Sequence, residues 1–366
     1  MRIMIICTRL SFGGAERVAV MWANGFVERG HTVMVISNLY EPITYQIDSR
    51  VIVRNLVSDN QRKWKKWGSA FINVRKALTE FRPDVVMGVM STCSLIARVA
   101  SIGMSVPVIA TEHNSFERPV SAPLTIWEKI TKKLLNKLYS HVTVLTEADR
   151  QFIGPRLKNV VVMPNPLVLK PAEVFPAKKK IVLSAGRLDA WYTKGFDVLI
   201  QSWGILIPTL PLTERDDWKL HIAGTGNEES LKHLEQLCKD NRVEDSVEFL
   251  GFRTDIEELY MQSEIFVLSS RYEGFGLVLI EAMSQGCACV ACDYKGRQSE
   301  IIRNSEEGLT CEPDNVDALA NSISMLIEDE EYRKRIQKKA IERSKYYSIE
   351  NTMDRWSRVL ETVINK

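Results

Sequence analysis

Short apolar runs alternate with helix-length amphipathic segments along almost the whole chain, and this alternation constrains the fold more than any other feature. In the first half it predicts strands at residues 3–7, 32–37, 84–90, 106–111 and 142–145, and helices at residues 15–29, 67–81, 93–102 and 124–139. Near-continuous Val and Ile runs separated by helices are typical of a parallel sheet covered on both faces. The first half is therefore predicted to be a doubly wound α/β domain.

The alternation starts again after a proline-containing segment at residues 164–180. It predicts strands at residues 180–185, 219–223, 247–250, 265–269 and 288–292, and helices at 195–207, 228–240, 255–262 and 276–285, with more helices to the end. A chain of 366 residues also has the length of about two domains. We therefore expect two tandem Rossmann-like doubly wound domains, at residues 1–170 and 171–349.

The formal net charge of +2 conceals an uneven distribution. Residues 1–170 hold 23 Lys and Arg against 12 Asp and Glu, whereas the remainder holds 25 against 34. Such asymmetry points to an anionic partner, for example a membrane surface, for the basic half. The first residues are too short an apolar run for a signal peptide, and the apolar stretch at 85–110 contains too many polar residues for a spanning helix. With seven cysteines and no secretory signal, we expect free thiols and a cytoplasmic protein.

Two motifs in the first half follow predicted strands. Gly13 and Gly14 open the first helix, where a backbone without side chains can approach a ligand and exposed N–H groups favour an anion. The spacing is not G-x-G-x-x-G, and a plain tight turn would explain the same residues. His113 ends a strand, where a ligand contact and a structural hydrogen bond are both open interpretations.

The second half carries more charge in equivalent loops. Arg187 and Lys194 lie between a strand and a helix, where they would clamp a diphosphate or remain two solvated cations. Glu273 precedes a helix that contains Glu281, and glycines between them leave the helix N-terminus uncovered. A phosphate would fit at that N-terminus, and each carboxylate would accept hydrogen bonds from hydroxyl groups. A capping Glu and an exposed helical Glu are the alternative.

Other patterns argue against metal and nucleotide-hydrolysing chemistry. The cysteines at 287, 289 and 292 fall on a predicted buried strand and have no Cys/His partners at zinc-finger spacing, so no metal is expected. There is also no P-loop and no Gly-x-Ser-x-Gly motif. The basic half lacks any recognised nucleic-acid-reading motif, which disfavours nucleic acid as a partner.

The combination of Gly13-Gly14, Arg187, Lys194 and the Glu273-x7-Glu281 element resembles glycosyltransferase family 4, the retaining glycosyltransferases with the two-Rossmann-domain GT-B fold. The resemblance covers nearly the whole chain and implies two domains facing a central cleft, with a C-terminal helix at about 350–366 packing back on the first domain. The motifs around His113 are most similar to bacterial enzymes that add N-acetylhexosamine, often N-acetylgalactosamine, to polyprenyl-diphosphate-linked glycans. One departure is the strand after Glu281, which lacks the proline usual in the family.

The resemblance implies a role for each matching residue in binding a nucleotide-sugar donor. Arg187 and Lys194 would hold the diphosphate and stabilise the leaving group, Glu281 would bind the ribose, and Glu273 would bind the donor sugar. The remaining donor-binding positions it implies are Gly14, Gly224, Gly226, Phe252, Arg253, Gly274, Phe275, Gly276 and Leu277. No cofactor and no metal are implied.

The resemblance also implies the reaction. His113 would approach the donor sugar from the first domain, Gly13 would lie at the acceptor, and the departing phosphate would accept the acceptor's proton during same-face attack. The best expectation is transfer of an N-acetylhexosamine from a UDP-sugar to a glycan or lipid-linked glycan in cell-surface polysaccharide or oligosaccharide biosynthesis. A transferase that uses a GDP- or UDP-hexose with a soluble acceptor, a phosphorylase, and a non-catalytic sugar-nucleotide-binding protein remain alternatives.

Part of the positive charge of the first half lies on the helix predicted at 124–139. Its lysines Lys129, Lys133 and Lys137 form one stripe, with Lys132 beside them, and Ile126, Ile130, Leu134 and Leu138 form another. A second cluster at residues 62–67 mixes cations with Trp64 and Trp67. We expect these residues to contact anionic lipid and the diphosphate of a lipid-linked acceptor, on the inner face of the plasma membrane. A solvated helix face and a surface loop are the alternative.

Overall fold

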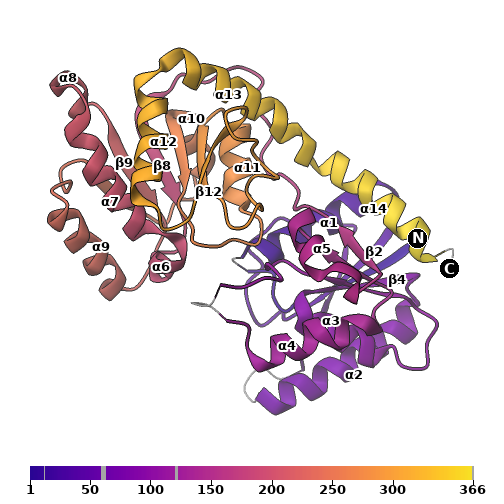
Figure 1. The fold of residues 1–366 in the computed structure, drawn as a ribbon. Coiled ribbons are helices and arrows are strands. Elements are labelled where there is room, and N and C mark those ends of the chain that lie inside the picture. The colour runs from indigo at the N-terminus through magenta and orange to yellow at the C-terminus, as the bar shows by residue number, and fades with distance from the viewer. Residues whose placement is uncertain (12, 59–62, 120–122, 365–366) are drawn as a thin grey trace. The chain divides into compact units, whose positions relative to one another are not determined.

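The computed structural model describes residues 1–11, 13–58, 63–119 and 123–364. Contacts divide the chain into two compact units: unit 1 comprises Met1–Pro166 and Ile349–Lys366, and unit 2 comprises Leu167–Ser348. Each unit consists of one sheet with helices on both faces (Figure 1). The charge asymmetry follows this division, because unit 1 holds 25 Lys and Arg against 15 Asp and Glu and unit 2 holds 23 against 31.

Unit 1 contains a seven-stranded sheet of order β3-β2-β1-β4-β5-β6-β7 in which every pair of neighbours is parallel. Its strands are β1 (Arg2–Ile6), β2 (Thr32–Ser37), β3 (Ile52–Asn55), β4 (Val85–Val89), β5 (Val108–Thr111), β6 (His141–Val144) and β7 (Val160–Val162). Its helices are α1 (Gly14–Glu28), α2 (Lys63–Phe81), α3 (Met90–Ala100), α4 (Ile126–Lys133), α5 (Glu147–Ile153) and α14 (Ile349–Ile364), with short 3₁₀ turns η1 (Leu135–Leu138) and η2 (Gly154–Arg156). The predicted parallel, doubly wound sheet is confirmed.

Unit 2 contains a six-stranded parallel sheet of order β10-β9-β8-β11-β12-β13. Its strands are β8 (Lys179–Ala185), β9 (Lys219–Ala223), β10 (Val247–Gly251), β11 (Ser263–Leu268), β12 (Ala288–Cys292) and β13 (Gly308–Cys311). Its helices are α6 (Trp191–Lys194), α7 (Phe196–Leu206), α8 (Leu212–Arg215), α9 (Glu228–Asp240), α10 (Ile256–Gln262), α11 (Leu277–Ser284), α12 (Val316–Glu328) and α13 (Glu330–Ser344), with 3₁₀ turns η3 (Leu188–Ala190), η4 (Ile207–Thr209) and η5 (Lys345–Tyr347).

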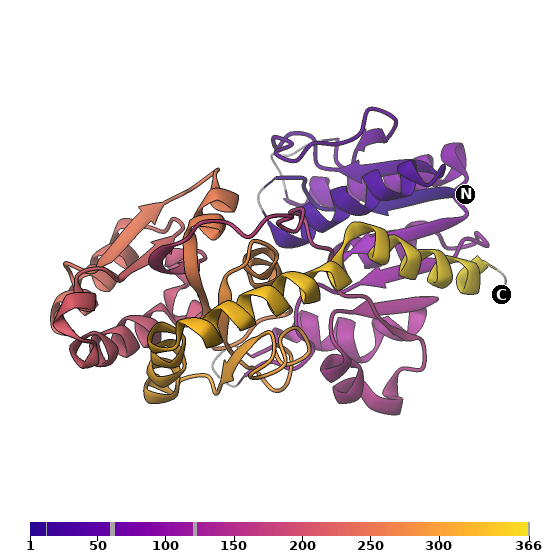
Figure 2. The same ribbon diagram turned by 90° about the horizontal axis from the view of Figure 1, so that it is seen from above.

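The C-terminal helix α14 lies against α1 of unit 1, although more than 300 residues separate them in the sequence (Figure 2). The Trp356 ring meets the Trp22 ring edge-on at 5.0 Å, and both indoles are fully buried. Arg29 at the end of α1 forms a 2.6 Å ion pair with Asp354. The apolar stripe of α14 therefore completes the core of unit 1.

The strand order reverses between β1 and β4 in unit 1, and between β8 and β11 in unit 2. The loops that leave the carboxyl ends of such strands diverge to opposite faces of the sheet and leave a crevice, where doubly wound proteins bind ligands. The loops that carry Gly14, Arg187 and Glu273 follow β1, β8 and β11 respectively. The topology thus places these loops at the switch points of the two sheets.

The structure differs from the prediction in three strands, in the helix predicted at 124–139, and in helices α5, α6 and α8, which were not predicted. Strands β3, β7 and β13 were not predicted. All three lie at sheet edges and are only three or four residues long, which is too short for a clear apolar run. The single helix predicted at 124–139 is wrong, since α4 ends at Lys133 and a 3₁₀ turn follows. Asn136 in that turn is buried while Leu134 and Leu138 are more than half exposed, so packing overrides the apolar spacing.

Candidate functional site

In unit 2, the structure brings Lys194 and Glu273 into direct contact. Lys194 Nζ lies 2.6 Å from Glu273 Oε1, and both side chains are largely buried. The same carboxylate oxygen accepts a 2.9 Å hydrogen bond from Ser270 Oγ. Because β8 and β11 are neighbours, loops that lie 79 residues apart in sequence share this cation–carboxylate pair.

Gly195 allows the two loops to approach this closely. It adopts a left-handed φ of 65°, and a Cβ at this position would lie only 2.0 Å from the Ser269 carbonyl oxygen. On either side of the contact, Ser269 Oγ donates to the Lys194 carbonyl oxygen at 2.9 Å, and Arg271 N–H donates to the Thr193 carbonyl oxygen at 2.9 Å. The position of Lys194 is thus fixed by backbone packing.

Arg271 is a site residue that the sequence analysis missed. Its guanidinium donates two hydrogen bonds of 2.8 Å to the Asp197 carboxylate and lies 3.9 Å from the centre of the Tyr192 ring. Bidentate Arg–carboxylate pairs are geometrically specific, so this contact orients the loop that carries Glu273. Its partner Asp197 lies 74 residues away in the sequence, and no local pattern predicts their contact.

Arg187, in contrast, extends into solvent at the end of β8. Its side chain is 76% exposed and its nearest carboxylate, Asp189, lies 3.9 Å away. The loop of Gly224 and Gly226 packs on the Arg187 loop, because a Cβ on Gly224 would lie 1.8 Å from the Gly186 carbonyl oxygen and one on Gly226 would lie 2.5 Å from the Asp189 nitrogen. These two glycines are therefore required for packing, independently of any ligand.

Helix α11 begins next to Glu273. Gly276 caps it with a left-handed φ of 98°, Phe275 is buried against Tyr347 at 5.6 Å between ring centres, and Gly274 and Leu277 are half-buried. Glu281 in this helix is 3% exposed. Its carboxylate accepts a 3.3 Å hydrogen bond from the hydroxyl group of Tyr260. Glu281 is thus a buried acceptor, not an exposed helical residue.

The loop after β10 holds the other two predicted donor-binding side chains. Phe252 is 57% exposed. Arg253 donates to both carboxylate oxygens of Asp255, at 2.8 and 2.5 Å. Arg253 is therefore already paired, and Phe252 offers the larger accessible surface.

In unit 1, His113 lies at the carboxyl end of β5 in a largely desolvated position. Its Nδ1 is 3.2 Å from Asn165 Oδ1, its Nε2 is 3.3 Å from Thr111 Oγ1, and the Trp22 ring lies 5.4 Å away. Desolvation lowers the pKa of His113 to about 4, although the hydrogen bond with Asn165 opposes the shift. The imidazole is therefore neutral near pH 7, with one ring nitrogen that donates a hydrogen bond and one that accepts.

Gly13 and Gly14 lie at the carboxyl end of β1. Gly13 exchanges two 3.0 Å hydrogen bonds with the Tyr45 hydroxyl group, through its N–H and its carbonyl oxygen. Gly14 begins α1 and is exposed. Gly14 at the start of α1 is therefore exposed, whereas Gly13 is held by Tyr45 and lies against the Glu16 carboxylate.

The prediction that Lys132 contacts a membrane surface is wrong. Its side chain is only 7% exposed, Nζ donates to the Ser115 carbonyl oxygen at 2.9 Å, and it lies 3.9 Å from Glu112 Oε2 and 4.3 Å from the centre of the Phe116 ring. Helical spacing places Lys132 beside the other lysines, but α4 packs on the loop after β5 through this side. Lys132 thus joins α4 to the loop that carries His113.

The other lysines of this segment differ from Lys132 in their exposure to solvent. Lys129 and Lys137 are exposed. The Lys133 side chain, Arg62 and the side chains of residues 63–66 lie outside the described residues, and Trp67 is 39% exposed. The apolar stripe beside the lysines is also exposed, with Ile126 at 78% and Leu134 at 62%. The surface around α4 thus combines accessible cations with accessible aliphatic side chains.

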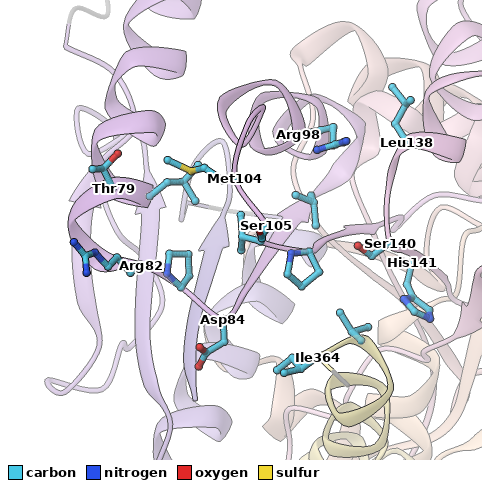
Figure 3. A pocket seen from close by; sticks show the side chains of 16 residues that line it. Thr79, Arg82, Asp84, Arg98, Met104, Ser105, Leu138, Ser140, His141 and Ile364 are labelled. Atoms are coloured by element: carbon cyan, nitrogen blue, oxygen red, sulfur yellow. The ribbon is translucent and has the colours of Figure 1, made fainter. Parts of the chain in front are cut away.

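A cavity of about 970 Å³ lies at the end of the unit 1 sheet where the strands begin (Figure 3). Asp84, Ser105 and His141 precede or begin β4, β5 and β6, and Figure 3 shows their side chains around it together with Arg98 and Ile364. These are the amino ends of the strands, whereas His113 and Gly14 follow carboxyl ends. The cavity is therefore separate from the candidate site.

Among the residues that the structure describes, no three His, Cys, Asp or Glu side chains are grouped as a metal site would require. Burial raises the pKa of Cys287 to about 11, and Cys289 and Cys292 are also buried free thiols. Within the same described ranges, no helix combines the length and apolarity needed to cross a membrane.

Comparison with known proteins places this geometry in a family. Residues 12–170 match the model "Glycosyltransferase Family 4", and residues 168–343 match "Glycosyl transferases group 1". The chain is 30% identical over 364 residues to the amylovoran biosynthesis glycosyltransferase AmsD of Erwinia amylovora, with 95% of this chain and 96% of AmsD covered. It is 26% identical to a GalNAc-alpha-(1->4)-GalNAc-alpha-(1->3)-diNAcBac-PP-undecaprenol alpha-1,4-N-acetyl-D-galactosaminyltransferase of Campylobacter jejuni, with 100% of this chain and 99% of that enzyme covered.

Solved structures share the fold at lower identity. The sucrose-phosphate synthase of Thermosynechococcus elongatus superposes with a TM-score of 0.83 at 18% identity, with 100% of this chain and 99% of that chain covered. Anabaena HepE in complex with UDP and glucose superposes with a TM-score of 0.78 at 18% identity, with 99% and 100% covered. These similarities identify the two-domain GT-B architecture.

Proposed function

Because this chain belongs to glycosyltransferase family 4, we propose that it transfers an N-acetylhexosamine from a UDP-sugar to a lipid-linked glycan, with retention of anomeric configuration, in bacterial cell-surface glycan biosynthesis. The observation that carries the proposal is the Lys194–Glu273 pair beside the start of α11. The UDP-binding structural relative and the relative that acts on a diphospho-undecaprenol-linked glycan support the choice of donor and acceptor.

The donor site would use the charges of unit 2 in two ways. Arg187 is exposed and free to fold over a diphosphate, while Lys194 would exchange part of its contact with Glu273 for the phosphate oxygens. Glu273 would then accept hydrogen bonds from the donor sugar, and the backbone N–H groups at the start of α11 would face the phosphates. Cations so placed stabilise the charge that develops on the leaving diphosphate.

The nucleoside would lie between the remaining predicted residues. Glu281 is a buried hydrogen-bond acceptor, so its carboxylate would accept hydrogen bonds from the two ribose hydroxyl groups rather than from bulk water. Phe252 offers an exposed ring on which a planar base would stack, and Gly224 and Gly226 present backbone without side chains. The proposed reaction needs neither a metal nor another cofactor.

His113 would act as a neutral hydrogen-bonding group toward the donor sugar. Its low pKa keeps it uncharged, so it would position a hydroxyl group without attracting the diphosphate. In the proposed mechanism the leaving phosphate oxygen takes the acceptor's proton, and the chain contributes positioning, water exclusion and electrostatic stabilisation. The acceptor would approach along the exposed start of α1 at Gly14.

The exposed surface of α4 and of the turn η1 that follows it would bind the cytoplasmic face of an anionic membrane. Ile126 and Leu134 would enter the interface, and Lys129 and Lys137 would contact lipid headgroups. Flotation with vesicles of phosphatidylglycerol or of phosphatidylcholine tests this, with a Lys129→Gln/Lys137→Gln variant. Equal recovery on both vesicles, or no loss in the variant, would contradict membrane binding.

Donor binding and transfer are tested separately. A screen of UDP-, GDP- and ADP-sugars for thermal stabilisation identifies the base, because a ligand at 100 times its Kd adds about 2.7 kcal/mol. Radiolabel from UDP-N-acetylhexosamine should then enter the organic phase with a polyprenyl-diphosphate-linked acceptor. Stabilisation by GDP-sugars alone, or label that stays in the aqueous phase, would refute the proposed donor or acceptor.

A further inference from the structure

A groove of about 830 Å³ lies beside α4 in unit 1. Apolar side chains form most of its wall: Phe116, Pro119, Pro123, Leu124, Phe152, Ile153 and Leu157. Four of these residues lie between β5 and α4, and the other three lie in α5 and directly after the turn η2. None of these residues belongs to the donor site proposed for unit 2.

Phe116, one of the apolar residues of the groove, is held in place by contacts on its backbone and on its ring. The Phe116 N–H donates to Oδ1 of the buried Asp149 at 2.9 Å, and Ser115 Oγ donates to the Glu117 carbonyl oxygen at 2.7 Å. The Lys132 ammonium lies over the Phe116 ring, with Nζ 4.3 Å from the ring centre. The apolar wall is thus preformed, as binding sites for small molecules generally are.

The charged side chains that line the groove are mostly cationic. Five cationic side chains and a single carboxylate line it: Arg118, Lys129, Lys132, Lys137 and Arg156, and Glu117. Lys132 and Arg118 are already engaged by protein groups. Lys129 and Lys137 are exposed and form no side-chain hydrogen bond or ion pair with any other described residue. The edge of the groove therefore offers two accessible cations next to an apolar wall.

We propose that this groove binds the isoprenoid chain of a single lipid diphosphate, with Lys129 and Lys137 at the diphosphate. The inference rests on the proposed function, since the lipid would be the carrier of the acceptor glycan. An apolar wall with cations at one edge fits an amphiphile that has an anionic head and a long aliphatic chain. A neutral lipid would have no anionic group to contact the two lysines, and a soluble anion would have no apolar chain to contact the wall.

The position of the groove agrees with this occupant. Phe116 follows His113 by three residues on the same loop, so a chain in the groove lies next to the loop that would face the donor sugar. On the same helix, the exposed Ile126 and Ile130 would rest on the bilayer from which the lipid comes. A single helix, α4, would then contact both the membrane and the bound lipid.

The test uses the full chain, farnesyl diphosphate as a soluble probe, and inorganic diphosphate as the headgroup alone. By calorimetry, farnesyl diphosphate should bind at least about tenfold more tightly, because only it contacts the apolar wall. Phe152→Ala and Leu157→Ala should each weaken farnesyl diphosphate severalfold without changing inorganic diphosphate. Lys129→Gln/Lys137→Gln should weaken both. Leu212→Ala, which changes an equally exposed aliphatic residue in α8 of unit 2, is the matched control and should change neither.

Equal affinity for the two probes, no binding of farnesyl diphosphate, or equal effects of Phe152→Ala and Leu212→Ala would each overturn the inference. An unchanged thermal midpoint in the variants excludes unfolding as the cause, and Leu157→Ala replaces Phe152→Ala if the latter is unstable. Transfer is measured separately with acceptors of short and long chain. Groove-dependent binding without any transfer would refute the proposed function alone, and transfer that Phe152→Ala leaves unchanged for every chain length would refute the groove alone.

Discussion

Lys132 and Glu112 form a buried pair whose disruption should destabilise unit 1 in a pH-dependent way. Glu112 is 3% exposed, its Oε1 has no hydrogen-bond partner among the described residues, and its Oε2 lies 3.9 Å from Lys132 Nζ. Burial raises the pKa of Glu112, and the Lys132 ammonium opposes that shift. Lys132→Met removes the cation and the hydrogen bond to Ser115 while it keeps most of the apolar stem.

The loss of stability in Lys132→Met depends on the protonation state of the Glu112 carboxyl group that stays buried. An ionised Glu112 without its cation is a buried, uncompensated charge, which costs about 3–5 kcal/mol. A protonated Glu112 leaves only unsatisfied neutral polar atoms, at about 1–3 kcal/mol. With the folded-state pKa above the unfolded value of about 4.3, the folded protein binds more protons between the two values. The free energy of unfolding therefore falls as the pH rises through that window, by up to about 1.4 kcal/mol per pH unit.

Urea denaturation at pH 5 and pH 8, followed by circular dichroism, measures this difference. Lys132→Met should lose more stability at pH 8 than at pH 5, and Lys132→Met/Glu112→Gln should recover much of the loss at pH 8. Lys129→Met, an exposed lysine of the same helix, should change stability by less than about 0.5 kcal/mol. The reasoning is refuted if the loss in Lys132→Met is equal at the two pH values, or if the double variant is as unstable as Lys132→Met at pH 8.

Three further predictions concern the candidate site. Glu273→Gln should lower transfer by about 10²-fold or more while UDP binding, measured by calorimetry, changes less, because the carboxylate faces the sugar in the proposed complex; a parallel loss of both would contradict that role. His113 has a pKa of about 4, so a pH profile of kcat/KM should show no ionisation of His113 between pH 5.5 and 8, and a His113→Gln variant should keep the shape of the profile. Gly224→Ala should destabilise unit 2 by more than about 1 kcal/mol in thermal denaturation, because its Cβ would lie 1.8 Å from the Gly186 carbonyl oxygen, and an unchanged midpoint would show that the loop can move aside.

The central strands and the order of the elements could be predicted because buried parallel strands require continuous apolar runs. The edge strands β3, β7 and β13 could not, because they are only three or four residues long and give too short a pattern to recognise. The helix at 124–139 shows the opposite error. Regular apolar spacing suggested a continuous helix, but the buried Asn136 and the exposed Leu138 show that contacts of this segment with unit 1 set its course.

For the candidate site, the sequence identified the loops but not the partners. Glycines, cations and carboxylates after strands marked the positions of Gly14, Arg187, Lys194 and Glu273. That Lys194 contacts Glu273 depends on the pairing of β8 with β11, and local sequence contains no information on strand order. The Asp197 partner of Arg271 depends on the same packing.

The sequence by itself determined the α/β class, the two repeated halves and the residue types at the ends of the strands, because helical period, apolar runs and glycines act locally. The tertiary structure alone decided which cations are available. In the sequence, Lys132 lies beside the stripe that contains Lys129, yet Lys129 is exposed and the Lys132 side chain is buried against Glu112 and Phe116. The reason is physical: helical spacing fixes only the angle between side chains, whereas burial depends on which face of the helix the rest of the fold covers.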